Sequence, residues 1–345
     1  CKTCTDPQLV FIINVCFYQE LPEPRMRGAE SSQSSSRSLD LRTGSPQRHA
    51  KIARTVVDSD YEELTQSIPP QIMSQCPGLQ RYLIGVEYLG TRFCGSQKQP
   101  NLRTVVGVLD DSGVHALSNV CHVDVQRISK RKPGEVLMPH EPDVVQRAVN
   151  HFLMEHGDIS VIDVRSVPPA FHARFNALER MYFYRILSGP ETLSIFDRDR
   201  AWHVTEELDI HNMQKACKVL VGRHDFSSFR ASGCQALSPI RTLDELYVSE
   251  VTATPNFPSF MEVPRENFNG FGARRKHRCY VITACAPSFL YHQVRLLVGL
   301  LKCVGTGDLT CSDVERILNA KTVTAASPMA PACGLYLGNV RYDLP

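Results

Sequence analysis

The sequence has little that points to a membrane or to a strongly charged partner. The apolar run Leu9–Phe17 is far shorter than the roughly 20 residues that cross a bilayer. It also lacks the flanks of a signal peptide, because Asp6 precedes it and no small-residue cleavage site follows. An excess of one charge is missing too, since 38 Lys and Arg stand against 36 Asp and Glu, a net charge of +2. Composition therefore predicts neither a membrane protein nor, by itself, a nucleic-acid binder.

Paired cysteine motifs are nearly absent, although cysteine itself is not. Of 13 cysteines, only Cys1 and Cys4 form a CxxC, and no second pair follows at zinc-finger spacing. The others, such as Cys94 and Cys217, stand singly in apolar or mixed surroundings. This pattern favours buried free thiols in a reducing, intracellular compartment over a metal site or a disulfide framework. No metal ligand is predicted.

Regular patterning is missing from the first part of the chain. Residues 1–78 contain a Ser-rich run and no sustained hydrophobic period, so they are predicted to be a disordered leader. Their Arg and Ser content leaves a mitochondrial location open beside a cytoplasmic or nuclear one. The whole chain has 43% hydrophobic and 21% charged residues, as a globular protein does, and 345 residues allow about two domains. We predict an N-terminal domain at 79–170 and a C-terminal domain at 171–345.

Strands and helices alternate in both predicted domains. Segments rich in β-branched and aromatic residues predict strands at 81–89, 114–125, 159–167, 181–187, 242–251, 278–286 and 334–340. One-sided apolar spacing predicts helices at 142–157, 209–221, 290–304 and 312–320. The connections vary too much in length for a doubly wound sheet. The predicted fold class is therefore α+β, with two split β-α-β units whose sheets are largely antiparallel and covered by helices on one face.

Few residues carry chemistry on their own. Asp111 stands beside a glycine at the entrance to a strand, where it is either a catalytic carboxylate or an ordinary turn residue. Residues 171–175 and 181–184 bring arginine, histidine and aromatics together, as nucleobase stacking needs, although a half-buried strand edge explains them equally well. Arg295 interrupts an apolar helix, so it needs a partner, and a carboxylate is the expected one. The basic run at 274–278 favours a solvated loop, within a turn-rich insertion at 255–277.

Four segments in this order resemble the TruA family of tRNA pseudouridine synthases: SGVHALSN, FHARFNALERMYFY, GRHDFSSFRASG and FLYHQVRLLVGLLKCVGTG. The resemblance implies two RRM-like halves around a central basic cleft, commonly in a homodimer whose two subunits together hold one tRNA. It implies isomerisation of uridine to pseudouridine in RNA, a reaction that requires no metal and no organic cofactor.

The resemblance also implies roles for individual residues. Asp111 matches the catalytic aspartate, Tyr182 the active-site tyrosine that stacks on the target uracil, and Arg295 the arginine that pairs with the aspartate. Arg174 matches an arginine expected to contact RNA. Three further residues in the matching segments are RNA-binding candidates: His172, Arg230 and His292.

The match fails around the aspartate. The family motif has Arg-Thr before it, where this chain has Leu109 and Asp110, and Ser96 stands where the family has Trp. The segment before Leu109 resembles the start of a helix, whereas the segment after Asp111 resembles a later strand. About 20–25 residues of helix, connection and strand are therefore absent by typical element lengths. We infer an internal deletion, and with it an alternative function: a destabilised isoform that binds RNA without catalysis.

Overall fold

The computed structural model describes most of the chain from residue 78 onward. The described residues are 78–92, 114–129, 131–132, 134–251 and 277–344, together with the backbone of 14–16. Almost all of the predicted leader, the predicted insertion at 255–277 except His277, and Asp111 lie outside these ranges. The predictions for those segments are not tested by the structure.

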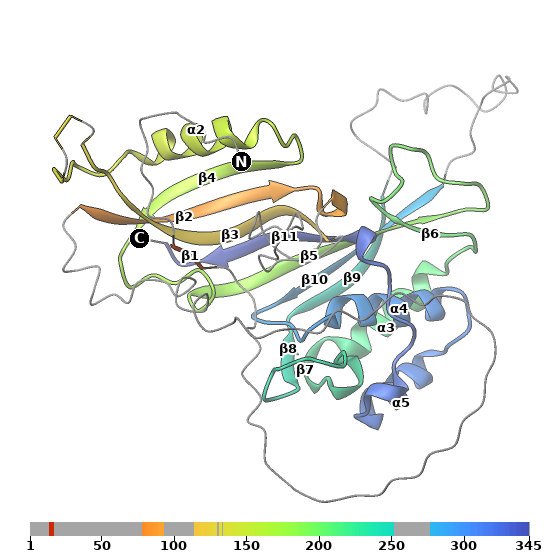
Figure 1. Cartoon of the computed structure of the whole chain (residues 1–345). Coiled ribbons are helices and arrows are strands. Elements are labelled where there is room, and N and C mark those ends of the chain that lie inside the picture. The colour runs from red at the N-terminus through yellow and green to blue at the C-terminus, as the bar shows by residue number, and fades with distance from the viewer. Residues whose placement is uncertain are drawn as a thin grey trace, which may run out of the picture.

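One large sheet runs through both halves of the chain (Figure 1). It has nine strands, and seven of them follow the order β4-β2-β3-β11-β5-β10-β9, while β1 pairs with β3 and β6 with β5. Neighbouring strands are antiparallel except at β3–β11 and β5–β6. Their bounds are β1 Asn14–Cys16, β2 Leu79–Tyr88, β3 His115–Gln126, β4 Ile159–Val167, β5 Ala177–Ser188, β6 Trp202–Val204, β9 Glu245–Val251, β10 Arg278–Ala286 and β11 Leu335–Tyr342. A separate hairpin pairs β7 (Gly222–Asp225) with β8 (Ile240–Leu243).

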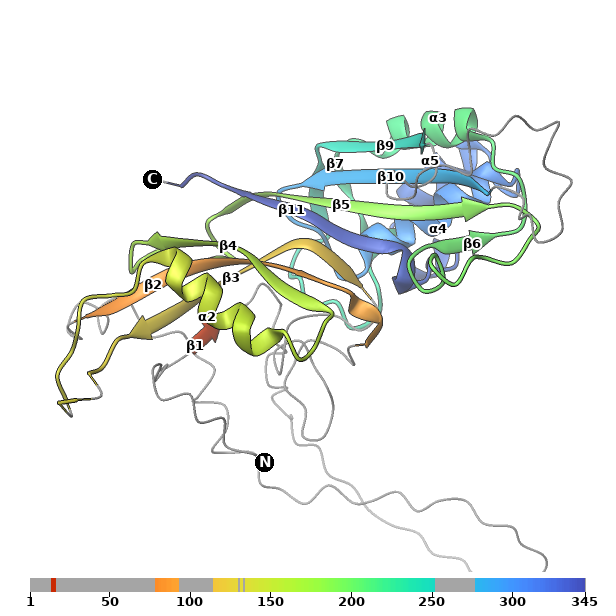
Figure 2. The same ribbon diagram turned by 90° about the horizontal axis from the view of Figure 1, so that it is seen from above.

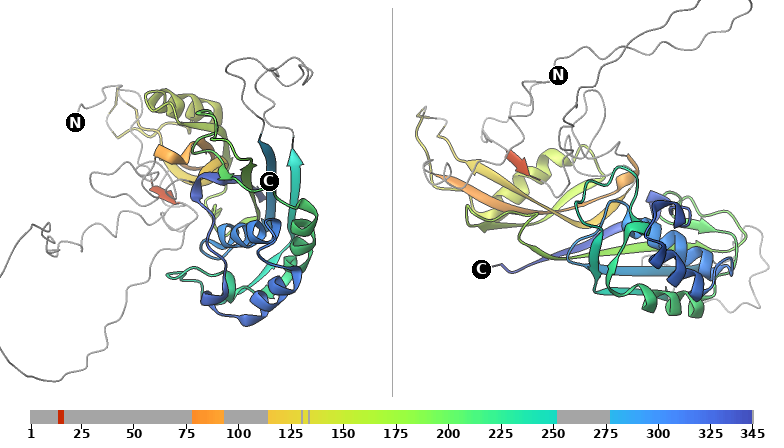
Figure 3. Two further views of the ribbon diagram at one scale, coloured as in Figure 1. Left: turned by 90° about the vertical axis from the view of Figure 1, so that its right-hand side faces the viewer. Right: turned by 90° about the horizontal axis from the view of Figure 1, so that it is seen from below.

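The described residues include four α-helices. The helix α2 (Pro142–Leu153) packs against β4 (Figure 1), whereas α4 (Gln293–Gly305) lies beneath β5 and β10 with α3 (Ile210–Leu220) and α5 (Cys311–Ala320) beside it (Figure 2). Figure 3 shows the green and blue helices α3, α4 and α5 gathered at one end of the molecule, away from the yellow-green α2. This arrangement confirms the predicted α+β class with a largely antiparallel sheet. Among these helices, none is long and apolar enough for a membrane crossing.

The connections follow one rule in both halves. In the first half, β2 lies antiparallel between β3 and β4, so the chain leaves β3, passes through α2 and returns in the parallel strand β4. In the second half, β10 lies between β5 and β9, which α3 connects, and β5 lies between β10 and β11, which α4 and α5 connect. Each strand is thus separated from its parallel successor by one antiparallel strand.

Local sequence explains where the helices begin. Asp209 caps α3 by accepting the backbone N–H of Asn212 at 3.0 Å. Thr310 and Asp313 form a reciprocal capping box at the start of α5. Pro142 occupies the first turn of α2, where no backbone donor is needed. These starts lie within three residues of the predicted ones, because caps are readable from single residue types.

Two hydrophobic clusters form the core. The larger contains side chains of α3, α4, α5, β5 and β10, and the smaller contains side chains of α2, β2, β3 and β4. Tyr182 of β5 packs against both clusters, and its cross-strand neighbour Leu337 of β11 belongs to the smaller one. The two halves of the sheet therefore meet at Tyr182, in the middle of the molecule.

The cysteines of the described residues are all free thiols. Four of the eight are buried, namely Cys121, Cys217, Cys279 and Cys285. Burial raises the pKa of Cys217 and of Cys285 to about 12, so both thiols are un-ionised. The same part of the chain contains no group of three or more His, Cys, Asp or Glu side chains placed to hold a metal ion.

A buried histidine gives the fold a pH dependence. His122 of β3 is 0% exposed, its Nδ1 accepts the backbone N–H of Ala173 at 3.2 Å, and its Nε2 has no hydrogen-bond partner among the described residues. Burial, assisted by the charges of Arg81 and His172, lowers the pKa of His122 to about 3.

Acidification is therefore expected to destabilise the protein through His122. The unfolded chain binds a proton at this side chain below about pH 6.5, whereas the folded chain does not until about pH 3. Between pH 7 and pH 5 this difference removes about 2 kcal/mol of unfolding free energy. Urea melts across that range measure it. In His122→Gln the pH dependence should be shallower by that amount, and an unchanged slope would assign the effect to other groups.

Candidate active site

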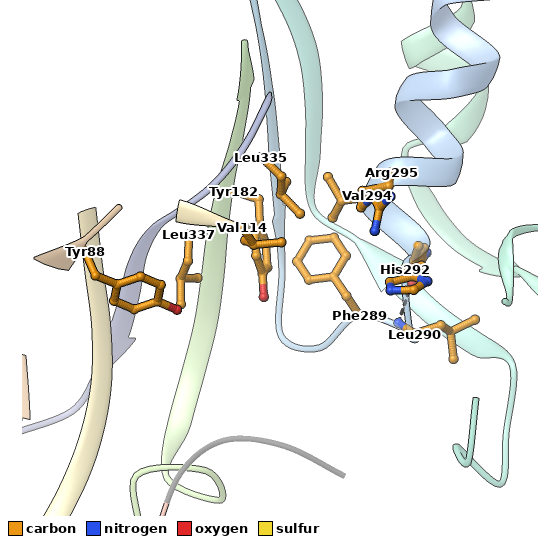
Figure 4. Close-up of a pocket in the computed structure, with 11 residues that line it drawn as sticks. Tyr88, Val114, Tyr182, Phe289, Leu290, His292, Val294, Arg295, Leu335 and Leu337 are labelled. Atoms are coloured by element: carbon orange, nitrogen blue, oxygen red, sulfur yellow. Dashed lines mark hydrogen bonds between the residues drawn. The ribbon is translucent and has the colours of Figure 1, made fainter. Parts of the chain in front are cut away.

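A pocket of about 90 Å³ opens where the two halves of the sheet meet the start of α4. Figure 4 shows its side chains converging from β2, β5, β11 and the turn before α4. These segments are far apart in the sequence and come together only in the fold. The lining residues are Tyr88, Val114, Tyr182, Phe289, Leu290, His292, Gln293, Val294, Arg295, Leu335 and Leu337.

Aromatic side chains form one wall. Tyr182 projects from β5, and its ring meets that of Phe289 edge to face, with centroids 5.2 Å apart. Tyr88 of β2 lies on the other side of Leu337 (Figure 4). Phe289 comes from the turn between β10 and α4. A half-buried tyrosine held by a second ring is a surface on which a planar base can stack.

A cation lies opposite the aromatic wall. Arg295 is the third residue of α4 and is half-buried. Its Nε donates to the carbonyl of Ala330 at 2.8 Å, and its own carbonyl accepts the N–H of Ala330 at 3.1 Å. These two bonds fix the arginine side chain and backbone against the segment that leads into β11. The sequence predicted a carboxylate partner for Arg295; the partner described is a backbone carbonyl, and Asp111 lies outside the described residues.

The start of α4 is shaped by an unusual turn. His292 precedes the helix with φ of 60°, in the left-handed region that non-glycine residues rarely adopt, and makes no side-chain cap. Gln293 closes the turn instead, because its Oε1 accepts the N–H of Leu290 at 2.7 Å. The His292 ring stacks on Tyr291 with centroids 3.7 Å apart. The N-terminal turn of α4 and the guanidinium of Arg295 therefore place positive charge beside the pocket.

The chain enters β3 at the edge of this pocket. Val114 lines it, and Val114 follows Asp111 by three residues. Its carbonyl lies so close to Gly90 that a Cβ on Gly90 would come within 1.7 Å of that oxygen. The next residue, His115, is held by two contacts of its ring. Its Nδ1 accepts the N–H of Gly90 at 3.2 Å, and its Nε2 lies 3.0 Å from the carbonyl oxygen of Asp199. Burial lowers the pKa of His115, so the ring is neutral and bridges these two backbone groups.

This chain is similar in sequence to known proteins. A family model described as tRNA pseudouridine synthase matches residues 216–343. The tRNA pseudouridine synthase A of Xanthobacter autotrophicus is 38% identical over 283 residues, which cover 76% of this chain and 100% of that protein. The tRNA pseudouridine synthase A of Rhodospirillum centenum is 39% identical, with the same shares of both chains covered. The chain belongs to the TruA family of tRNA pseudouridine synthases.

The structure brings three of the TruA-type site residues together and separates the others. Tyr182, Arg295 and His292 line the pocket. His172 and Arg174 lie in the loop between β4 and β5 and do not line the pocket. A buried arginine connects this loop to the turn beside the pocket. Arg180 of β5 donates to the carbonyl of Arg174 at 3.0 Å and also to the carbonyl of Pro287, two residues before Phe289.

Arg230 is held elsewhere by its own loop. One terminal nitrogen of its guanidinium donates to the carbonyls of Cys234 and Ala236, at 2.8 and 2.6 Å. It therefore stabilises the turn after the 3-10 helix at Ser227–Phe229 and does not line the pocket.

Two residues of the pocket and its surroundings, Phe289 and Arg180, were not predicted from the sequence. Phe289 begins the fourth segment that resembles the family, but no role was assigned to it, because it looks like any apolar residue before a helix. Arg180 was not singled out from the sequence, and it is 4% exposed within β5. A charge inside the β-rich run 177–188 was the available signal, of the same kind that singled out Arg295.

Proposed function

We propose that this chain isomerises uridine to pseudouridine in RNA, with tRNA as the class of RNA. The observation that carries the proposal is the pocket itself, in which the aromatic wall of Tyr182 and Phe289 lies beside Arg295. Val114, three residues after Asp111, lines the same pocket. The bacterial relatives that this chain matches over their full length are named tRNA pseudouridine synthase A.

The reaction balances without a redox step. The C1′–N1 bond breaks, the uracil rotates, and C1′ rejoins through C5; the C5 hydrogen leaves as a proton while N1 gains one. We assign to the Asp111 carboxylate the role of nucleophile or base, which requires its ionised form. The guanidinium of Arg295 and the N-terminal turn of α4 would favour that form by lowering the carboxyl pKa.

The uridine must leave its stack before it can react. Flipping a base out costs a few kcal/mol, and stacking on an aromatic ring recovers about 1–3 kcal/mol. Tyr182, braced by Phe289, is the side chain we assign to this stacking. Arg174, His172, Arg230 and His292 are proposed to contact the RNA around the target, chiefly at phosphates, which fix its register.

The domain plan and assembly are proposed as well. We infer two RRM-like halves with a boundary near residue 170, which is supported by the separate hydrophobic clusters and by the interleaved parallel strands in each half. We also propose the homodimer that the family commonly forms. We further propose that, within the family, this chain belongs to the vertebrate tRNA pseudouridine synthase-like 1 branch, which its motifs resemble.

A second candidate function is RNA binding without catalysis. It is favoured by Leu109 and Asp110, which stand where the family has Arg-Thr, and by the inferred deletion. The alignment to the Xanthobacter protein spans 283 positions, whereas 76% of 345 residues is about 262, so about 21 positions have no counterpart in this chain. That difference supports a deletion of the size inferred from the sequence.

Release of tritium from RNA labelled at uracil C5 separates the two functions, because isomerisation must exchange that hydrogen and binding cannot. We expect release from unmodified tRNA transcripts by the wild-type chain. A version carrying a family-length segment before Ser112 should release tritium faster and melt at a higher temperature. RNA binding with no release would favour the second function, and equal melting and equal turnover of the two versions would contradict the deletion.

A further inference from the structure

A second aromatic surface stands apart from the pocket, in the loop between β4 and β5. Phe175 is 76% exposed although it lies in a loop whose neighbours Phe171 and Ala173 are buried. The guanidinium of Arg174 lies 5.6 Å from the centroid of its ring, and the ring of His172 lies 4.4 Å away. We call His172, Arg174 and Phe175 the platform.

The loop under the platform is fixed by hydrogen bonds from below. Arg81 donates to the carbonyls of Pro169 at 2.7 Å and Phe171 at 2.9 Å. Tyr342 donates to the carbonyl of Ala173 at 2.7 Å, and Ala173 in turn donates to the buried His122. Four side chains from four strands therefore hold this loop, counting Arg180 on the carbonyl of Arg174. An exposed ring on a fixed loop loses little conformational entropy when it binds.

The platform is aromatic and positively charged, but its histidine is neutral. The Nδ1 of His172 accepts the N–H of Arg174 at 3.1 Å, and burial together with Arg81 and Arg174 lowers the pKa of His172. At neutral pH the platform thus presents a phenyl ring, an uncharged imidazole and one guanidinium. This combination suits a planar, electron-rich base attached to a phosphate, and it suits an apolar protein surface less well, because the guanidinium would be desolvated.

The platform is tied to the pocket by Arg180. This buried side chain donates both to the loop of the platform and to the turn that carries Phe289. We propose that Phe175, with His172 and Arg174, stacks on a second nucleobase of the same RNA, one that stays outside the pocket while the target uridine enters it. The proposal rests on the RNA-directed function proposed above, and it adds a stacking residue and a second nucleotide subsite to it.

Binding to an unmodified tRNA transcript tests the platform without requiring turnover. We expect Phe175→Ala to raise the dissociation constant about tenfold, within the range measured for loss of one stacked base, and Phe175→Trp to stay close to wild type. Phe196, 59% exposed in the loop at the other end of β5, is the matched control, and Phe196→Ala should bind as wild type does. Melting temperatures of the variants should agree, because both rings are exposed.

Transcripts with a single abasic site, moved one position at a time, identify the nucleotide. One position should weaken binding of the wild type and leave binding of Phe175→Ala unchanged. A dissociation constant of Phe175→Ala within twofold of wild type overturns the proposal, as does an equal loss in Phe175→Trp. A change in oligomeric state without a change in RNA affinity would assign Phe175 to a protein contact instead.

The two proposals fail in different ways. If wild type binds RNA and never releases tritium, the catalytic function is wrong, and the Phe175 result still decides the platform. If wild type releases tritium and Phe175→Ala does so with an unchanged KM, only the platform is wrong.

Discussion

Arg295→Met is expected to reduce tritium release about 10²–10³-fold, the loss typical for removing one preorganised electrostatic group from an active site. If Arg295 pairs with the Asp111 carboxylate as proposed, removing the guanidinium would leave less of that carboxylate in its ionised form, and the developing charge would lose its partner. Arg295→Lys keeps the charge and should retain part of the activity, although a lysine cannot hold the Ala330 carbonyl in the same geometry. Initial rates with saturating transcript measure both variants.

A cycle with Asp111→Ala distinguishes this role from a structural one. Asp111→Ala alone should abolish release, and the double variant should be no slower than the worse single variant, because two groups that act as one unit are not additive. Losses that multiply would mean that Arg295 acts independently of Asp111. Wild-type release by Asp111→Ala would show that the carboxylate lies elsewhere. Circular dichroism melts of each variant control for unfolding.

Arg81→Met is expected to cost about 3–5 kcal/mol of unfolding free energy, because it leaves a buried carboxylate without its cation. Arg81 and Asp124 are 2% and 0% exposed, and they form two parallel bonds of 2.6 and 2.7 Å. Replacing both partners, as in Arg81→Met with Asp124→Leu, should restore much of the loss, since an apolar pair of similar volume pays no desolvation cost. For a chain of this size the single variant should melt roughly 10 °C lower.

An exposed ion pair provides the control. Arg147 and Asp143 of α2 lie 3.0 Å apart with side chains 73% and 62% exposed, so Arg147→Met should cost less than about 0.5 kcal/mol. Equal losses in the two single variants would mean that burial does not set the energy of the Arg81 pair. The single variant Arg81→Met should also weaken RNA binding if the platform is real, because it removes two of the bonds that hold that loop.

Most of the elements could be predicted from the sequence because their patterns are local. The strands at 159–167 and 278–286 have the predicted bounds, since alternating or continuous apolar residues run between clear turn signals. The predicted strand at 242–251 is two strands, broken at Asp244, whose N–H donates to Cys285 rather than continuing the ladder of β8. Short strands such as β6 were missed, because three residues carry no period.

The site could be predicted only in part, for a physical reason. Arg295 was singled out because it interrupts an apolar helix and Tyr182 because it stands in an aromatic run that matches the family, and the fold brings both to the pocket. Arg230, like Arg295, is an arginine within a segment that matches the family. Its guanidinium, however, donates to two carbonyls of its own turn. Which hydrogen bonds a side chain makes depends on segments distant in the sequence, and no local pattern encodes that.

The contact between Gly90 and Val114 has a consequence for how this family can vary. The two residues, with the bond from the Gly90 N–H to His115, hold the end of β2 against the start of β3. The register of these two strands is therefore set by described contacts on either side of residues 93–113, not by how many residues join them. A chain can lose or gain residues in that interval and keep the same strand pairing. Activity differences between versions of this chain with longer and shorter intervals would then report on the stretch that carries Asp111, and not on a change in the pairing of β2 with β3.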